Sequence, residues 1–115
     1  MAISSFEAQV RHQMQISIID LQGEINSSAE NVLNAAYEEA VSQKPALLLL
    51  NFRQVDYINS SGIALIVGLL KRAQKIQCPL MACGLSEHYI EIFQITRLTD
   101  YMRLFPDEAS ALKQM

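Results

Sequence analysis

The most informative stretch of this sequence for the fold is Asn59-Ser60-Ser61-Gly62-Ile63-Ala64-Leu65-Ile66-Val67-Gly68-Leu69-Leu70. It opens with small polar residues whose side-chain oxygens suit the free amides of a helix start. From Ile63 to Leu70 it carries no charged or hydrogen-bonding side chain, so the helix lacks a polar face. A domain of 115 residues has little capacity to bury a helix on every side. We therefore expect a helix from about Ser61 to Ile76 with an apolar patch at its start, unless neighbouring helices cover it.

The two glycines of this segment are costly inside a helix, by about 1 kcal/mol each relative to alanine. Close approach would explain both glycines, and the alternative is that the helix simply tolerates them. Gly68 would let the helix lie near a sheet, and Gly62 would leave the helix mouth open to the backbone of a partner.

A buried strand precedes this helix. Residues 46–52 hold four consecutive leucines between Pro45 and the polar Arg53-Gln54, a pattern typical of a strand covered on both faces. Residues 56–59 are then expected to form a loop. Binding sites on open α/β sheets lie at the C-terminal ends of strands, which is where this loop falls.

The N-terminal part predicts a hairpin followed by a helix. Residues 6–10 alternate apolar and polar, residues 15–22 are rich in isoleucine, and His12-Gln13-Met14 is the expected turn between them. Ser27 and Glu30 fit a capping box. The helix after it would bury one stripe, made of Val32, Leu33, Ala36 and Ala40.

The C-terminal part continues the alternation. A short strand is expected near 80–82, a helix from about 84 to 93, a connection at 96–100, a strand at 101–105 and a helix after Pro106-Asp107. The order β-β-α-β-α-β-α-β-α indicates an α/β fold. We find no linker or internal repeat. The prediction is one domain over residues 1–115, with a mixed, mostly parallel sheet, an N-terminal hairpin and about four helices.

The composition argues against several classes of function. The net charge of −3 argues against nucleic acid or an anionic membrane as the main partner. The longest apolar run is far shorter than the ~18 residues of a spanning helix. Cys78 and Cys83 match neither a metal-site spacing nor a C-x-x-C motif, so we expect two buried free thiols, no metal and no cofactor. No signal peptide is recognised at the N-terminus, which favours the cytoplasm.

An enzyme is not expected. The chain has no G-x-S-x-G elbow, P-loop or G-x-G-x-x-G motif. Its histidines are His12 in the predicted turn and His88 on a predicted helix, and both read as surface or packing residues. Asp56 lies near Ser60, but without a base it cannot complete a triad.

Ser60 has two interpretations. It can serve as an ordinary cap residue at the start of the helix. It can also be a phosphorylation site, because a phosphate at a helix N-terminus meets free amides and the positive end of the helix dipole. The modification would add about −1.5 to −2 charges. The domain could accept that charge, whereas a partner docked over the apolar patch could not.

At these residues the chain resembles the STAS domain family, and within it the bacterial anti-sigma factor antagonists. Residues 21–26, Leu-Gln-Gly-Glu-Ile-Asn, are similar to the family's early Gly-Glu-Leu-Asp segment. Residues 47–52 resemble its buried strand, and residues 55–63, Val-Asp-Tyr-Ile-Asn-Ser-Ser-Gly-Ile, resemble its Asp-Ser-Ser-Gly-Leu switch motif. The likeness covers nearly the whole chain.

The resemblance implies a switch. The family's phosphorylated serine corresponds to Ser60, and its partners are an anti-sigma factor that is also a serine kinase and a metal-dependent serine phosphatase. The implied partner-binding residues are Asn26, Ile58, Asn59, Ser60, Ser61, Gly62, Ile63 and Leu65. The chain departs from the pattern at Asn59 and Asn26, where the family usually has aspartate, and each departure removes a carboxylate.

A second reading stays open. STAS-like domains also serve as adaptors or scaffolds in stress-signalling and transport complexes, without being phosphorylated. In either reading we expect a monomer or weak dimer. Phosphate found on both the wild type and Ser60→Ala, or on neither, would favour the adaptor.

Overall fold

A β-hairpin opens the fold in the computed structural model, which describes residues 5–113. Strand β1 (Glu7–Gln13) pairs antiparallel with β2 (Ile16–Ile25) from Glu7 opposite Gln22 to Gln13 opposite Ile16. The turn therefore begins at Met14, which has a positive φ of 57°. The predicted turn at residues 12–14 was wrong by two residues, because His12 continues the ladder of β1 opposite Ser17.

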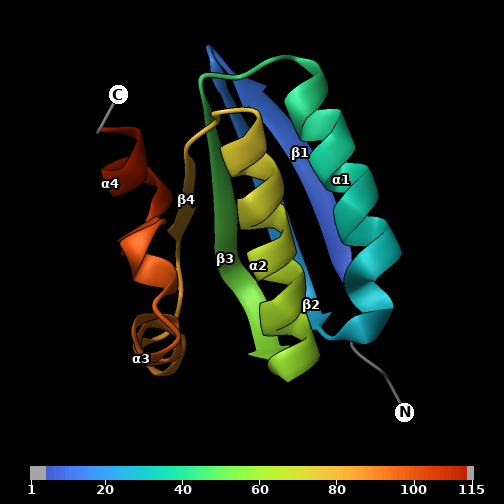
Figure 1. The fold of residues 1–115 in the computed structure, drawn as a ribbon, viewed down its shortest axis with the longest axis vertical. Coiled ribbons are helices and arrows are strands. Elements are labelled where there is room, and N and C mark those ends of the chain that lie inside the picture. Colours follow the sequence, from blue (N-terminus) through green and yellow to red (C-terminus); the bar gives the residue numbers. More distant parts are fainter. Residues whose placement is uncertain (1–4, 114–115) are drawn as a thin grey trace.

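The other strand pairs of the sheet are parallel, as predicted. Within residues 5–113 the sheet has five strands in the order β1-β2-β3-β4-β5, with an α-helix in each crossover (Figure 1). The further strands are β3 (Leu47–Ile58), β4 (Leu80–Cys83) and β5 (Arg103–Phe105), and the helices are α1 (Glu30–Ser42), α2 (Ser60–Lys75), α3 (Glu87–Ile95) and α4 (Glu108–Leu112). Two short 3-10 helices, η1 (Ser27–Ala29) and η2 (Leu98–Asp100), complete the described elements. The predicted fold class and element order are confirmed.

Two layers of helices cover the sheet unequally. The main core lies between the sheet and helices α1, α2 and α3, where Leu50, Phe52 and Phe93 are at most 2% exposed. On the opposite face there is a smaller core, and among residues 5–113 the only helix that packs against it is α4, through Ala111 and Leu112. Because α4 spans only five residues, part of that second face stays open.

Strand β3 is longer than the sequence suggested. Residues 56–58 were predicted as loop, but they continue the strand, and Ile25 still pairs with Ile58. The polar residues Arg53, Gln54 and Asp56 are exposed rather than buried, so the apolar run alone marked only the first half of the strand. Two register shifts against β2 accompany this extension.

The first helix also begins differently from the prediction. Asn26, not Ser27, is the cap residue, because its side chain accepts a hydrogen bond from the amide of Ser28. Asn26 caps η1, and the chain passes through η1 before α1 begins. Leu33, Ala36 and Ala40 are buried as predicted, whereas Val32 is 41% exposed. Both free cysteines are buried, as expected.

Candidate functional site

Asn59 fixes the turn between β3 and α2. Its side-chain oxygen accepts a hydrogen bond from the amide of Gly62 at 2.8 Å, and its carbonyl accepts one from the amide of Ile63 at 2.9 Å. Its own amide donates to the carbonyl of Ile25 at the end of β2, at 3.2 Å. These three bonds tie the helix start to two neighbouring strands. An asparagine therefore serves here as the helix cap without the carboxylate of the usual motif.

Gly62 brings α2 onto the end of β2. A β-carbon at this position would lie 2.1 Å from the carbonyl oxygen of Ile25, a distance no side chain can occupy. A β-carbon at Gly68 would meet nothing within 4 Å. The assignment of close approach to the sheet was therefore wrong for Gly68. The expectation that Gly62 leaves the helix start open to a partner's backbone was wrong too, because Gly62 is buried against the end of β2.

Ser60 is the first residue of α2 and is exposed, and Ser61 after it is exposed too. Beneath them, Ile58 is 4% exposed and Gly62 is buried, so these two residues shape the turn from below. The turn thus presents hydroxyl groups outward on a base held by the core. This arrangement satisfies the geometric need of a modifiable serine, namely an accessible oxygen on a fixed support.

The apolar stretch of α2 divides into buried and accessible residues. Ile66, Leu69 and Leu70 are buried in the core. Ile63, Leu65 and Val67 are partly buried and pack against it, and Ala64 is exposed. The apolar side chains of this helix are therefore neither all buried nor all exposed. Its first two turns leave apolar atoms accessible beside Ser60.

Tyr89 supports the same turn from α3 and was not anticipated from the sequence. Its hydroxyl accepts a hydrogen bond from the amide of Ile58 at 2.9 Å, and the residue is 8% exposed. Strand β4 ends at Cys83, whose partner is Asn51, so β3 runs on without a β4 neighbour and a side chain supplies the acceptor. The two residues are 31 positions apart, and no local pattern signals such a contact.

Asn26 ends β2 as Asn59 ends β3. Its side-chain oxygen accepts from the amide of Ser28 at 2.9 Å and from the Ser28 hydroxyl at 2.5 Å. Because β2 and β3 are parallel neighbours, both asparagine turns lie at one end of the sheet, together with the starts of α1 and α2 (Figure 1). The structure thus brings the predicted site residues to one end of the molecule.

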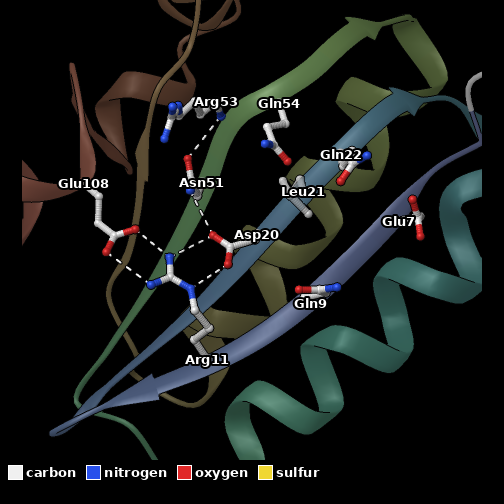
Figure 2. Close-up of a pocket in the computed structure, with 10 residues that line it drawn as sticks. All are labelled: Glu7, Gln9, Arg11, Asp20, Leu21, Gln22, Asn51, Arg53, Gln54 and Glu108. Carbon is white, nitrogen blue, oxygen red and sulfur yellow. Dashed lines mark hydrogen bonds and ion pairs between the residues drawn. The ribbon is translucent and has the colours of Figure 1, made fainter.

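A second feature is a polar groove on the open face of the sheet (Figure 2). Arg11 of β1 donates to both oxygens of Asp20 and pairs with Glu108 of α4, while the side-chain amide of Asn51 donates to Asp20. Hydrogen bonds from Arg11, more than any other influence, hold the pKa of Asp20 below its usual value. The network joins α4 to the hairpin, and its arginine already has carboxylate partners.

The described residues give no sign of a metal centre or a reactive thiol. Residues 5–113 contain no group of three or more potential metal ligands. Burial raises the pKa of the Cys83 thiol to about 11, which keeps it protonated near neutral pH. Within the same range no helix is long and apolar enough to cross a membrane.

Comparisons with known proteins agree with this architecture. A family model described as "STAS domain" matches residues 7–111. A Listeria monocytogenes protein named anti-sigma-B factor antagonist is 28% identical over 100 residues, which span 87% of each chain. An anti-sigma factor antagonist from Mycobacterium paratuberculosis has the same fold, with a TM-score of 0.84 at 19% identity over 98% of this chain and 96% of its own.

A structure of the Bacillus cell fate determinant SpoIIAA in its phosphorylated form also superimposes, with a TM-score of 0.70 at 21% identity over 96% of this chain and 98% of its own. At these identities the structural likeness shows the fold alone. The family assignment rests instead on the family model, which spans nearly all of the described sequence. The chain belongs to the STAS domain family.

Proposed function

We propose that this protein is an anti-sigma factor antagonist. It binds an anti-sigma factor that is also a serine kinase, through the turn at Asn59 and the first two turns of α2. The observation that carries the proposal is the exposed Ser60 on a rigid turn, beside the accessible apolar atoms of Ile63 and Leu65. A docked partner would cover both the hydroxyl and these apolar atoms. Burial of the apolar atoms would contribute about 25 cal/mol per Å² of apolar surface to the free energy of binding.

Phosphorylation of Ser60 would end this binding. The phosphate would sit at the start of a 16-residue helix, whose first amides and dipole favour negative charge. The domain therefore tolerates the modification, while a partner packed against the same surface would have to bury an unpaired charge. A metal-dependent serine phosphatase would restore the unmodified form. The protein would act as a binding regulator in the cytoplasm, without catalytic activity of its own.

The remaining site residues have supporting roles in this proposal. Asn59 and Gly62 hold the turn, Ile58 anchors it in the core, and Ser61 borders the modified hydroxyl. Asn26 lies on the neighbouring turn and widens the contact surface toward α1.

The test uses each anti-sigma factor kinase encoded in the source genome, produced singly and titrated with this protein. We expect wild type and Ser60→Ala to bind one of them, and Ser60→Asp to bind at least about tenfold more weakly, as loss of roughly 1.4 kcal/mol implies. Gln74→Asp is the matched control, because it adds the same charge at an exposed position at the other end of α2.

Equal affinity of Ser60→Asp and wild type for the bound kinase would contradict the switch. Intact mass after incubation with ATP gives a second readout, and no phosphate on the wild type would favour an adaptor that is never phosphorylated. Binding to none of the kinases would contradict the antagonist function itself.

A further inference from the structure

Strand β1 forms an open edge of the sheet. In the part of the chain that the structure describes, β1 is the outermost strand, and no strand pairs with the side of it that faces away from β2 (Figure 1). Such edges readily pair with another chain, and proteins usually prevent this with short strands, prolines, bulges or charged side chains. The other edge of the sheet has that protection, because β5 spans three residues, begins with Arg103 and is followed by Pro106.

Most of this protection is missing from β1. The strand spans seven residues without proline or lysine, and its ladder with β2 runs through all seven without a register shift. Its one arginine, Arg11, leans toward the interior of the sheet, where the guanidinium bonds Asp20 and Glu108 (Figure 2). The edge is therefore long and regular, and its arginine head group is directed inward.

The helix beside this edge adds an apolar surface. Ala8 and Val10 of β1 are half-buried and pack against the main core, on the face of the sheet that α1 covers. Val32 of α1 is 41% exposed. The side of α1 that faces α2 is marked by Asn34, which accepts a hydrogen bond from Arg72 at 3.1 Å. At 3.6 residues per turn Val32 projects from nearly the opposite side, and therefore faces the open edge beyond β1.

We propose that two copies of this chain associate through β1. The two β1 strands pair antiparallel and join both sheets into one, with the α1 helices of both copies on the same face. The partner is thus a second copy of the chain, and the contact consists of the backbone of β1 and the outer side of α1. The sequence left a monomer or weak dimer open, and this edge selects a weak dimer.

The charges of β1 select the register. Because side chains alternate between the two faces, only registers that keep the helix-covered sides of both copies together are allowed. A register centred on Val10 pairs all seven residues, with Glu7 opposite Gln13 and Arg11 opposite Gln9 of the second copy. Each of these two charged side chains then faces a glutamine. A register centred on Arg11 would oppose two like charges, which is destabilising.

The joined sheet also brings the two α1 helices together. Helix α1 lies over β1 and β2, so equivalent helices of the two copies would be about two strand spacings, or roughly 10 Å, apart. Packed helices have about this separation. Val32 and the small side chain of Ala36, one turn later, lie on the sides that meet. The dimer would therefore bury the apolar atoms of Val32 that the single chain leaves exposed.

The pairing leaves the turn at Asn59 accessible. Antiparallel pairing rotates one copy by half a turn about an axis perpendicular to the sheet, so the Asn59 turns of the two copies lie at opposite ends of the joined sheet. The dimer would offer two separate Ser60 hydroxyls. Its formation does not depend on the function proposed above.

Sedimentation equilibrium of the full chain, from micromolar to millimolar concentration, measures the association. We expect a reversible dimer. Gln13→Glu, which faces Glu7 of the second copy, should raise the dissociation constant about fivefold, and Gln13→Lys should lower it about fivefold, because symmetry repeats each cross-strand pair. Gln13 is exposed, so neither substitution should disturb the fold.

A second pair of variants tests the helix contact. Val32→Glu should raise the dissociation constant at least about tenfold, because it places a carboxylate in an apolar contact. Asn31→Glu is the matched control, because it adds the same charge at the neighbouring exposed position, on the side of α1 away from the sheet. It should leave the dissociation constant unchanged. Hydrogen exchange should show that alternate amides of β1 become more protected as the concentration rises.

Three results would overturn the proposal. A chain that stays monomeric at millimolar concentration would show that the edge of β1 does not associate. A dimer that is unaffected by the Gln13 and Val32 substitutions would assign the association to another surface. A shift in the same direction for Gln13→Glu and Gln13→Lys would refute the register centred on Val10. Kinase binding at the Asn59 turn is tested separately, so each of these results would leave the proposed function intact.

Discussion

Gly62 lies so close to Ile25 that a β-carbon on the glycine would be 2.1 Å from the isoleucine carbonyl oxygen. The same oxygen accepts a hydrogen bond from the amide of Asn59, so it cannot move away without breaking the support of the turn. The helix start, the end of β2 and the cap of α2 are therefore one rigid unit. Its rigidity rests on the absence of a single side chain.

Gly62→Ala should destabilise the protein by about 1–3 kcal/mol, the usual effect of forcing a methyl group into a filled space. Gly68→Ala is the matched control, because its β-carbon would meet nothing within 4 Å. There, the better helix propensity of alanine should raise the free energy of unfolding by up to about 1 kcal/mol. Urea denaturation of both variants measures the difference, and an equal effect of the two substitutions would show that the close contact is absent in solution.

Tyr89→Phe should cost about 1–3 kcal/mol of stability, because it leaves the buried amide of Ile58 without its acceptor. The phenylalanine ring keeps the packing, so the loss isolates the hydroxyl. Tyr101→Phe, at a residue 65% exposed, should change stability by less than about 0.5 kcal/mol. Hydrogen exchange at the Ile58 amide provides a local readout. Unaltered protection in Tyr89→Phe would mean that another group accepts this hydrogen bond.

Asp20→Asn should lower stability at pH 7 by about 1 kcal/mol or less, since the pair with Arg11 is partly exposed. Arg11 lowers the pKa of Asp20 from its ordinary value of 3.8, so the unfolded chain binds a proton there before the folded chain does. The stabilisation is thus complete above about pH 4 to 5 and is lost as the pH falls through the folded-state pKa.

The difference between Asp20→Asn and wild type should therefore shrink below about pH 4, as thermal unfolding at several pH values can show. Asp100→Asn serves as the control, because Asp100 pairs with an exposed arginine, Arg97, three residues away. A difference that stays constant from pH 7 to pH 3 would mean that the carboxylate charge contributes nothing to the network in Figure 2.

Local patterns predicted the strands, the helices and the turn at Ser60, because each depends on residues close in sequence. Leu47 to Leu50 marked β3, and Asn59 marked the start of α2. The hydroxyl of Tyr89 and the extension of β3 to Ile58 depend on partners in other elements, which a single sequence does not reveal.

The two glycines illustrate the same limit. Helical spacing places Gly62 on the face of Ile66 and Leu69, and this periodicity would have shown that it, rather than Gly68, faces the sheet. What the spacing does not reveal is that the opposing atom is a backbone oxygen, which turns a preference for glycine into a requirement.

Charged substitutions among the accessible apolar residues of α2 should weaken partner binding. Leu65→Asp and Ile63→Asp should weaken binding to the proposed anti-sigma factor kinase at least about tenfold, because each would bury an unpaired carboxylate in the contact. Both residues also pack against the core, so some loss of stability is expected. Ala64→Asp removes this ambiguity, since Ala64 is exposed in the same turn and its substitution should leave the fold unchanged.

Ile66→Asp marks the opposite extreme, because Ile66 is 1% exposed and the variant should not fold. Circular dichroism separates folding from binding for each variant, and titration with the kinase measures affinity. If Ala64→Asp is folded and binds as tightly as wild type, the partner does not cover the first two turns of α2. In that case Ser60 phosphorylation could not act by placing charge within the contact.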